Sequence, residues 1–298
     1  MSSKIKGSIC GIVAAISYGT NPLGALGLKA LGITTGSMLF YRFAIAIIIL
    51  GGILIFQRES FSITKKELCV LAALGILFSL SSLGLFISFN YMEAGIASTI
   101  LFIYPVIVAV MMAVLFKEQT SLSTMIAIFL SLGGIVLLYQ GDGNVVLDAV
   151  GMAFVLFASF TYAVYIIVTN KMPVNHSPVK ITFYVLVFAL MVVIIYSLIS
   201  PDNYIQWLET PEMWGYVSIL AVISTVISVV LITIAIKEIG STPTAIMGAL
   251  EPLTAVLIGV LVFHEKFTLR LVGGIILIMA AVLLIIIKDA FKNKVANR

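Results

Sequence analysis

The stretch YPVIVAVMMAVLFKE, from Tyr104 to Glu118, returns 147 residues later as EPLTAVLIGVLVFHE, from Glu251 to Glu265. Three residues recur at equivalent positions: Pro105 as Pro252, Phe116 as Phe263 and Glu118 as Glu265. Offsets of 143 to 145 residues align other parts of the chain, as loop insertions would produce. The sequence is therefore a duplication, and we place its two halves at residues 1–143 and 144–298.

Composition predicts an all-α integral membrane protein. Of the 298 residues, 61% are hydrophobic and only 10% are charged, too few charges to cover a soluble domain of this size. Apolar stretches of about 20 residues, long enough to cross a bilayer as helices, recur along the chain. We predict ten transmembrane spans, at 7–28, 34–56, 68–89, 95–116, 122–140, 147–169, 179–199, 213–236, 243–263 and 269–287.

Each half thus contains five predicted helices. Because five is odd, the second half enters the membrane from the side opposite to the first. The expected architecture is an inverted repeat, with a pseudo-two-fold axis in the membrane plane. In transporters built this way, the substrate site lies near the bilayer midplane between the repeats, and alternating access exchanges the conformations of the two halves.

Basic residues in the loops predict the orientation. With the N-terminus in the cytoplasm, 13 of the 17 lysines and arginines fall on cytoplasmic segments and 3 on external segments, while Arg42 lies inside a span. We therefore expect both termini on the cytoplasmic side of the cell (plasma) membrane. The net charge of +4 reflects this bias toward anionic lipid, and it does not indicate nucleic-acid binding.

The paired segments and the 5+5 layout together resemble EamA-type transporters of the drug/metabolite transporter superfamily. The resemblance covers essentially the whole chain. It implies a central cavity lined by spans 1–4 and 6–9, with spans 5 and 10 at the periphery. It also implies export or uptake of small metabolites such as amino acids, or of nucleotide-linked or drug-like compounds.

Two ionisable residues, Arg42 and Glu251, lie clearly inside predicted spans. A charge at mid-helix costs about 2.5–3.5 kcal/mol on insertion scales, so such groups usually face a bundle interior or a wet cavity. Arg42 is expected to bind a substrate carboxylate and Glu251 an amino group, which suits an amino acid. Alternatively, Glu251 carries a proton, or the two side chains form a structural ion pair. Tyr104 stands where the second half has Glu251, so the repeated fold does not require this carboxylate.

Three prolines are predicted to bend helices beside the cavity. Pro22, Pro105 and Pro252 each remove a backbone hydrogen bond to the carbonyl four residues earlier. Such breaks at membrane depth are tolerated where they are buried in protein or line a cavity. The carbonyl freed by Pro252 belongs to Gly248, which has no side chain to shield it. Packing alone is the competing explanation of these bends.

Other polar residues within the spans complete the predicted substrate site. They are small hydroxyl residues, an amide and tyrosines placed near mid-span, away from the interfacial belts where tyrosine is usually found. The full predicted substrate-binding set is Glu251, Arg42, Tyr18, Asn21, Tyr41, Ser79, Ser82, Tyr104, Tyr162, Tyr165, Ser224, Ser228 and Gly248. Glu118 and Glu265, at the ends of the paired segments, are expected to be solvated boundary residues.

Motifs for other chemistry are missing from the sequence. It has no H-E-x-x-H, G-x-S-x-G or P-loop pattern, so we expect no enzyme, catalytic residue, metal or cofactor. The expected function is secondary-active or facilitative export of small metabolites such as amino acids. Its expected partners are a small-molecule substrate, protons under the second interpretation of Glu251, and the lipid bilayer. The alternatives are an uptake carrier, a multidrug exporter or a non-transporting membrane scaffold or sensor.

Overall fold

The computed structural model describes residues 3–115, 122–139, 148–171, 176–239, 247–248 and 250–296, and all regular structure in these ranges is helical. The helices of the first half are α1 (Ser3–Gly19), α2 (Asn21–Ala30), α3 (Thr35–Phe56), α4 (Lys65–Ser88), α5 (Ala94–Leu101), α6 (Tyr104–Leu115) and α7 (Leu122–Tyr139). Those of the second half are α8 (Ala149–Lys171), α9 (Pro178–Ile199), η1 (Pro201–Asn203), α10 (Pro211–Ser218), η2 (Ile219–Ile227), α11 (Ser228–Ile239), α13 (Leu250–Phe263) and α14 (Leu269–Ala296).

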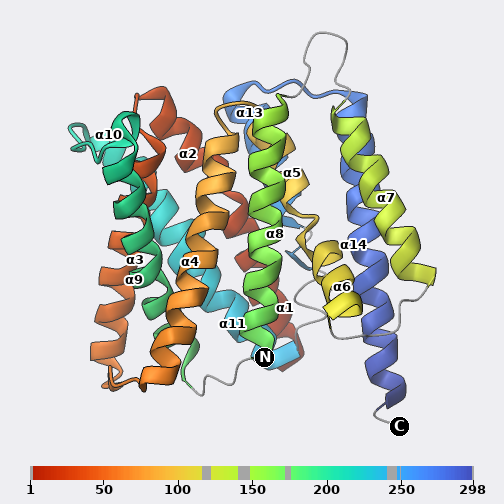
Figure 1. Cartoon of the computed structure of the whole chain (residues 1–298), viewed down its shortest axis with the longest axis horizontal. Coiled ribbons are helices and arrows are strands. Elements are labelled where there is room, and N and C mark those ends of the chain that lie inside the picture. The colour runs from red at the N-terminus through yellow and green to blue at the C-terminus, as the bar shows by residue number, and fades with distance from the viewer. Residues whose placement is uncertain are drawn as a thin grey trace.

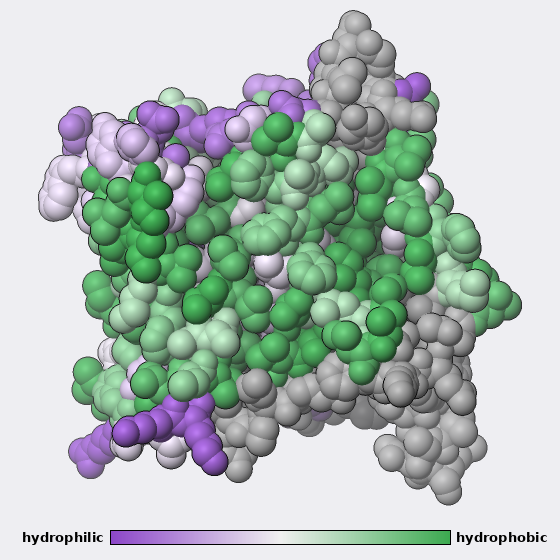
Figure 2. Space-filling model, in the orientation of Figure 1, coloured by the Kyte–Doolittle hydropathy of each residue, from purple (hydrophilic) through white to green (hydrophobic). Residues whose placement is uncertain are grey.

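The exterior is that of a membrane protein. Among the described residues, seven helical segments are long and apolar enough to cross a bilayer, and three further apolar helices are shorter, at Met125–Leu137, Leu250–Phe263 and Leu269–Leu284. Figure 2 shows a broad apolar band with hydrophilic residues above and below it. The predicted all-α membrane fold is confirmed, while the count of ten spans stays a prediction. In Figure 1, α1 begins and α14 ends near the same edge of the bundle.

Helices of one half pack against helices of the other. α1 runs along α11, α4 along α8, α3 along α9, α7 along α14, and α5 along α13. Two hydrogen bonds repeat across this arrangement: Ser81 Oγ donates to the Ala158 carbonyl at 2.9 Å, and Ser228 Oγ donates to the Ala14 carbonyl at 3.1 Å. Ala14 and Ala158 are equivalent positions of the duplicated sequence, so a serine of the opposite half pairs each of two equivalent carbonyls, although Ser81 and Ser228 do not themselves align.

Local sequence explains where several helices begin. Thr34, Thr64, Ser177 and Thr210 precede α3, α4, α9 and α10, and each side chain accepts a hydrogen bond from the backbone amide three residues later. This arrangement satisfies one of the unpaired amides at each helix start. The hydroxyl-rich loops between the apolar runs therefore set the starts of these helices.

Two spans of the first half are interrupted next to a proline. α1 ends at Gly19 and α2 begins at Asn21, directly before Pro22. α5 ends at Leu101 and α6 begins at Tyr104, directly before Pro105. The Leu101 carbonyl, which Pro105 cannot pair, accepts a hydrogen bond from Ser159 Oγ of α8 at 2.9 Å. A hydroxyl from the other half thus satisfies this carbonyl, which the sequence alone left open for a substrate.

Candidate functional site

Glu251 lies in the first turn of α13, next to the buried ring of Pro252. The side chain is half-buried, and its carboxylate has no hydrogen bond or ion pair with any residue in the described ranges. The charge acts electrostatically on the hydroxyls of Tyr18, Tyr104 and Tyr162. Glu251 is therefore an unpaired carboxylate facing three tyrosines inside the helix bundle.

Two of these tyrosines, Tyr104 and Tyr162, belong to a row of aromatic rings that crosses between the halves. The rings of Tyr104 from α6 and Tyr162 from α8 meet edge to face, with centroids 4.7 Å apart. Tyr162 stacks on Tyr165 at 5.7 Å, and Phe78 of α4 lies 5.8 Å beyond Tyr165. Aromatic faces carry negative electrostatic potential that attracts cations. The carboxylate and the rings beside it together form an environment suited to a positively charged group.

Arg42 of α3 is held at several points. Its side chain is only 1% exposed, and its Cζ lies 5.5 Å from the ring centre of Phe86 and 5.8 Å from that of Phe43. Its Nε donates to Thr225 Oγ1 at 2.9 Å, and its guanidinium is within hydrogen-bonding range of the Tyr18 hydroxyl. Its Nη2 is buried and has no partner among the described residues.

Arg42 and Glu251 form no ion pair with each other. The Tyr18 hydroxyl is within hydrogen-bonding range of the Arg42 guanidinium and within electrostatic range of the Glu251 carboxylate. The structural ion pair considered from the sequence is thus absent from this structure, in which Tyr18 lies within electrostatic range of both charges.

An unusual helix supports Arg42 from the second half. η2 is a π-helix of nine residues, and Thr225 Oγ1 donates to the Leu220 carbonyl five residues earlier at 2.9 Å. Ser224, on the same helix, shares a 2.8 Å hydrogen bond with Thr20 at the break between α1 and α2. π-Helical turns occur often at functional sites. No feature of the sequence predicted this π-helix, although Thr225 lies next to the predicted Ser224.

Two other predicted residues, Tyr41 and Ser228, have hydrogen-bond partners within the protein, and a third, Gly248, lies near an aromatic ring. The Tyr41 hydroxyl donates to the Gln206 carbonyl at 3.0 Å, in the segment between α9 and α10. Ser228 binds the Ala14 carbonyl, as described above. Gly248 is half-buried, and a Cβ on it would lie 3.9 Å from the Phe102 ring.

Three further predicted residues, Asn21, Ser79 and Ser82, are buried. The Asn21 side-chain carbonyl and the Ser79 hydroxyl have no hydrogen-bond partner in the described part of the chain. The structure therefore gathers six predicted residues in one group, Glu251, Arg42, Tyr18, Tyr104, Tyr162 and Tyr165, and distributes the remainder over the surrounding helices.

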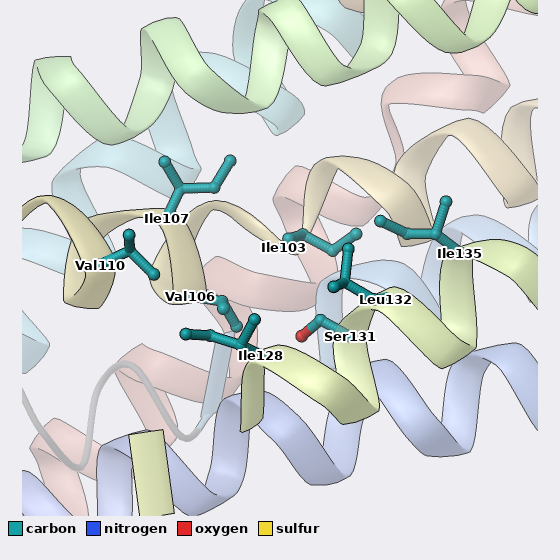
Figure 3. A pocket seen from close by; sticks show the side chains of 8 residues that line it. All are labelled: Ile103, Val106, Ile107, Val110, Ile128, Ser131, Leu132 and Ile135. Carbon is teal, nitrogen blue, oxygen red and sulfur yellow. The ribbon is translucent and has the colours of Figure 1, made fainter. Parts of the chain in front are cut away.

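A separate groove of about 200 Å³ lies between α6 and α7. Its walls are aliphatic except for Ser131, and Figure 3 shows Val106 and Ile107 of α6 facing Ile128 and Leu132 of α7 across it. A lining of this kind offers no charged group to orient a polar metabolite. We therefore place the candidate substrate site at Glu251 and not in this groove.

Glu265 corrects a sequence-based expectation. It is not a solvated boundary residue: the side chain is half-buried, and its carboxylate accepts hydrogen bonds from the backbone amides of Ala94 at 2.6 Å and Gly95 at 3.0 Å. These amides begin α5, where a negative charge is favoured. Burial raises the pKa of the Glu265 carboxyl, and the two amides oppose that rise. Its repeat mate, Glu118, lies outside the described residues.

Comparison with known proteins gives the family. The sequence model of the EamA-like transporter family matches residues 5–140 and again residues 149–287. The chain belongs to the EamA-like transporter family. The two matched segments each cover most of one half of the duplicated sequence.

Curated relatives are named as transporters. An uncharacterized transporter of Bacillus subtilis, YcbK, is 24% identical over 279 residues, covering 90% of this chain and 88% of its own length. An uncharacterized transporter of Archaeoglobus fulgidus is 28% identical over 193 residues, covering 64% of this chain and 67% of its own length. One solved crystal structure shares the fold, with a TM-score of 0.65 at 16% identity over 94% of this chain and 96% of that chain. This EamA-like chain is therefore a multi-pass membrane transporter.

Proposed function

We propose that this EamA-like chain exports small amino-bearing metabolites, amino acids first among them, by secondary-active or facilitative alternating access. The observation that carries the proposal is Glu251, a half-buried carboxylate without a hydrogen-bond or ion-pair partner in the described ranges. An unpaired charge inside a membrane bundle marks a functional group by default. A substrate ammonium would supply the missing partner, and the rings of Tyr18, Tyr104 and Tyr162 would add cation–π attraction.

Arg42 is the proposed partner of the substrate carboxylate. Its Nε is already bound to Thr225, whereas the buried Nη2 remains an unused donor. A guanidinium recognises carboxylates well because its donors match the geometry of the two oxygens. Since Tyr18 stands against the guanidinium, we propose that the Tyr18 side chain moves aside when a carboxylate binds.

The packing of the broken spans supports alternating access. α13 packs on α5, α1 and α2, while α6, the continuation of α5 beyond the break, packs on α7, α8 and α14. The two spans that carry Pro105 and Pro252 therefore contact each other through α5 and α13. Beyond the break, α6 packs against other helices. We propose that the contact between α13 and α5 closes one end of a substrate cavity around Glu251. With the predicted orientation, α5 lies on the external side and both termini lie in the cytoplasm of a cell-membrane protein.

The experiment is a binding and flux comparison on purified protein in liposomes. A thermal-shift screen first identifies amino acids, amines or carboxylic acids that stabilise the native state. Glu251→Gln should then abolish stabilisation by amino acids and by simple amines, whereas Arg42→Ala should affect only ligands with a carboxylate. Tyr104→Phe, which keeps the ring, is the matched control and should retain most of the binding.

Three results would redirect the proposal. Unchanged ligand binding and flux in Glu251→Gln would contradict an ammonium site at this carboxylate. If Glu251→Gln instead keeps downhill flux but loses its dependence on a pH gradient, then Glu251 carries a proton rather than the substrate. A uniform absence of flux across substrates, in well-folded wild type, would favour a scaffold or sensor.

A further inference from the structure

Glu265 occupies a seat formed by two glycines from different halves of the chain. A Cβ placed on Gly259 of α13 would lie 2.6 Å from Glu265 Cδ, and one placed on Gly95 of α5 would lie 3.0 Å from Glu265 Oε2. Real Cβ atoms essentially never approach another heavy atom to less than 3.0 Å. The carboxylate therefore fits between α13 and α5 only because both positions lack a side chain.

The backbone after α13 folds Glu265 back into this seat. His264 adopts a left-handed conformation with φ of 56°, which few residues other than glycine favour, although histidine tolerates it better than most. The Glu265 amide then donates to the Gly259 carbonyl at 2.9 Å. A second link crosses the same interface, from the Lys266 amide to Glu93 Oε1 at 3.4 Å.

Only one of the two glycines of the seat has a glycine at the equivalent position of the other half, since Gly95 aligns with Gly240. The repeat aligns Glu265 with Glu118, but it aligns Gly259 with Met112. A methionine at that position would fill the space that the carboxylate needs. The duplicated glutamate therefore keeps its place in the sequence in both halves, while the glycine that admits its carboxylate is present in one half only.

We infer that Glu265 is a latch that holds α13 of the second half against the start of α5 in the first, closing the substrate cavity at one membrane face. A carboxylate that accepts two backbone amides at a helix start makes charge-assisted hydrogen bonds, which are stronger than neutral ones. The link joins the two spans that carry the paired prolines, and it lies at the opposite end of α13 from Glu251. For the face predicted to be external to open, this latch must release. The inference rests on the proposed alternating access.

Cysteine labelling tests the latch without any substrate. Val256 of α13 is only 4% exposed, and its Cα lies 3.2 Å from where a Gly95 Cβ would be. Val256→Cys, in a background with Cys10→Ser and Cys69→Ser, therefore reports whether α13 and α5 separate. In sealed right-side-out vesicles, a membrane-impermeant maleimide should label this cysteine slowly.

Two different variants should release the latch. Glu265→Ala removes the carboxylate, and Gly259→Ala keeps the charge but pushes the carboxylate out of its seat. In both, labelling from outside should be about tenfold faster or more, the scale expected for losing a charge-assisted hydrogen bond. The matched control is Gly52→Ala on α3, where an added Cβ meets no atom within 4 Å. Glu118→Gln, the repeat mate, should also leave labelling unchanged.

Labelling at the rate of the controls in both variants would overturn the inference. Equal acceleration by Glu118→Gln would also overturn it, because the effect would then not depend on the seat. A thermal unfolding curve for each variant confirms that the labelled protein is folded. Because no substrate is used, a transport defect in Glu251→Gln and a labelling change in Glu265→Ala are independent results, so the latch and the proposed substrate site can fail separately.

Discussion

The segments Tyr104–Leu115 and Glu251–Phe263 are repeat mates that have kept the same backbone device and diverged in chemistry. Both carry a proline at their second position, which leaves a carbonyl unpaired one turn earlier. At the first position, however, the first half has Tyr104 and the second has Glu251. Positions that both halves share support the fold, whereas positions at which they differ are free to carry function.

The same distinction applies away from the prolines. Arg42 of α3 aligns with Val185 of α9, and Gly259 aligns with Met112. Arg42 and Glu251 both act on Tyr18, and Gly259 seats Glu265. The asymmetric residues therefore gather at the candidate substrate site and at one closed end of it. An inverted repeat needs such differences, since two identical halves would bind a symmetric ligand and open equally to both faces.

Exchanging the first-position residues is the strongest way to break the comparison. Glu251→Tyr makes the second half resemble the first and removes the charge. Because a charge-assisted hydrogen bond contributes about 1.5–3 kcal/mol, amine binding should weaken by about ten- to hundredfold. Adding Tyr104→Glu returns a carboxylate to the mate position, which lies within electrostatic reach of Glu251, and should recover part of the binding. Calorimetry on each variant measures both effects.

Amine binding that does not depend on a carboxylate would contradict this prediction. If Glu251→Tyr binds amines as well as wild type, the rings alone suffice for recognition. A control with Tyr104→Phe separates the phenol hydroxyl from the ring and should change affinity less than either exchange.

The hydrogen bond between Arg42 of the first half and Thr225 of the second gives the next effect. Thr225→Val removes the acceptor of Arg42 Nε in a buried position, which should lower the free energy of unfolding by about 1–3 kcal/mol. Adding Arg42→Met replaces both polar partners with apolar groups, as Val185 does at the mate position. Because an apolar pair leaves no buried charge unpaired, the double variant should regain much of the loss. Denaturation in detergent measures both, and strictly additive losses would show that the two residues act independently.

The overall fold was predictable because its causes are local in the sequence. Apolar runs of bilayer length predict the helices, and hydroxyl residues such as Thr34 and Thr64 mark where α3 and α4 begin. The duplicated segments can be aligned from the amino-acid sequence alone. At the candidate site, Arg42 and Glu251 were predictable because a charged side chain inside a transmembrane span is costly whatever residues surround it.

What the sequence could not predict depends on distant partners. Glu265 follows an apolar run and resembles any solvated span end, but its seat includes Gly95, 170 residues earlier. The π-helical turn η2 depends on the register of Ser224 and Thr225 against Thr20 and Arg42. The Leu101 carbonyl freed by Pro105 is paired by Ser159 from the other half. Each of these needs the three-dimensional pairing of the halves before its chemistry is visible.

The closure held by Glu265 should depend on pH. Burial raises the pKa of the seated Glu265 carboxyl above the ordinary value of 4.5, with Glu93 adding to the rise. A proton therefore binds the seated state more tightly than the released state, so by linkage acid favours closure. Labelling of Val256→Cys should rise as the external pH increases from 4.5, after normalisation to Glu265→Ala to remove the reactivity of the thiol itself.

The charged neighbours of the latch must be controlled. Glu93 faces Glu265 from the start of α5, and His264 and Lys266 flank it in sequence. Glu93→Gln removes the like charge and should move the labelling transition to lower pH. A normalised labelling rate that falls as pH rises would contradict the direction of the Glu265 pKa shift.

The smallest expected effect concerns hydrogen bonds to two equivalent carbonyls, each made by a serine of the opposite half. Ser81→Ala and Ser228→Ala each remove one interhelical hydrogen bond, to the equivalent carbonyls of Ala158 and Ala14. Such bonds contribute about 0.6 kcal/mol on average inside membrane proteins, so each variant should lose roughly that much stability, with substrate binding unchanged. Equal losses in a thermal unfolding series would show that the repeat preserves its packing energetics as well as its shape. A loss in one variant several times that in the other would mean that the asymmetry of the halves extends beyond Arg42, Glu251 and Gly259 to the helix contacts themselves.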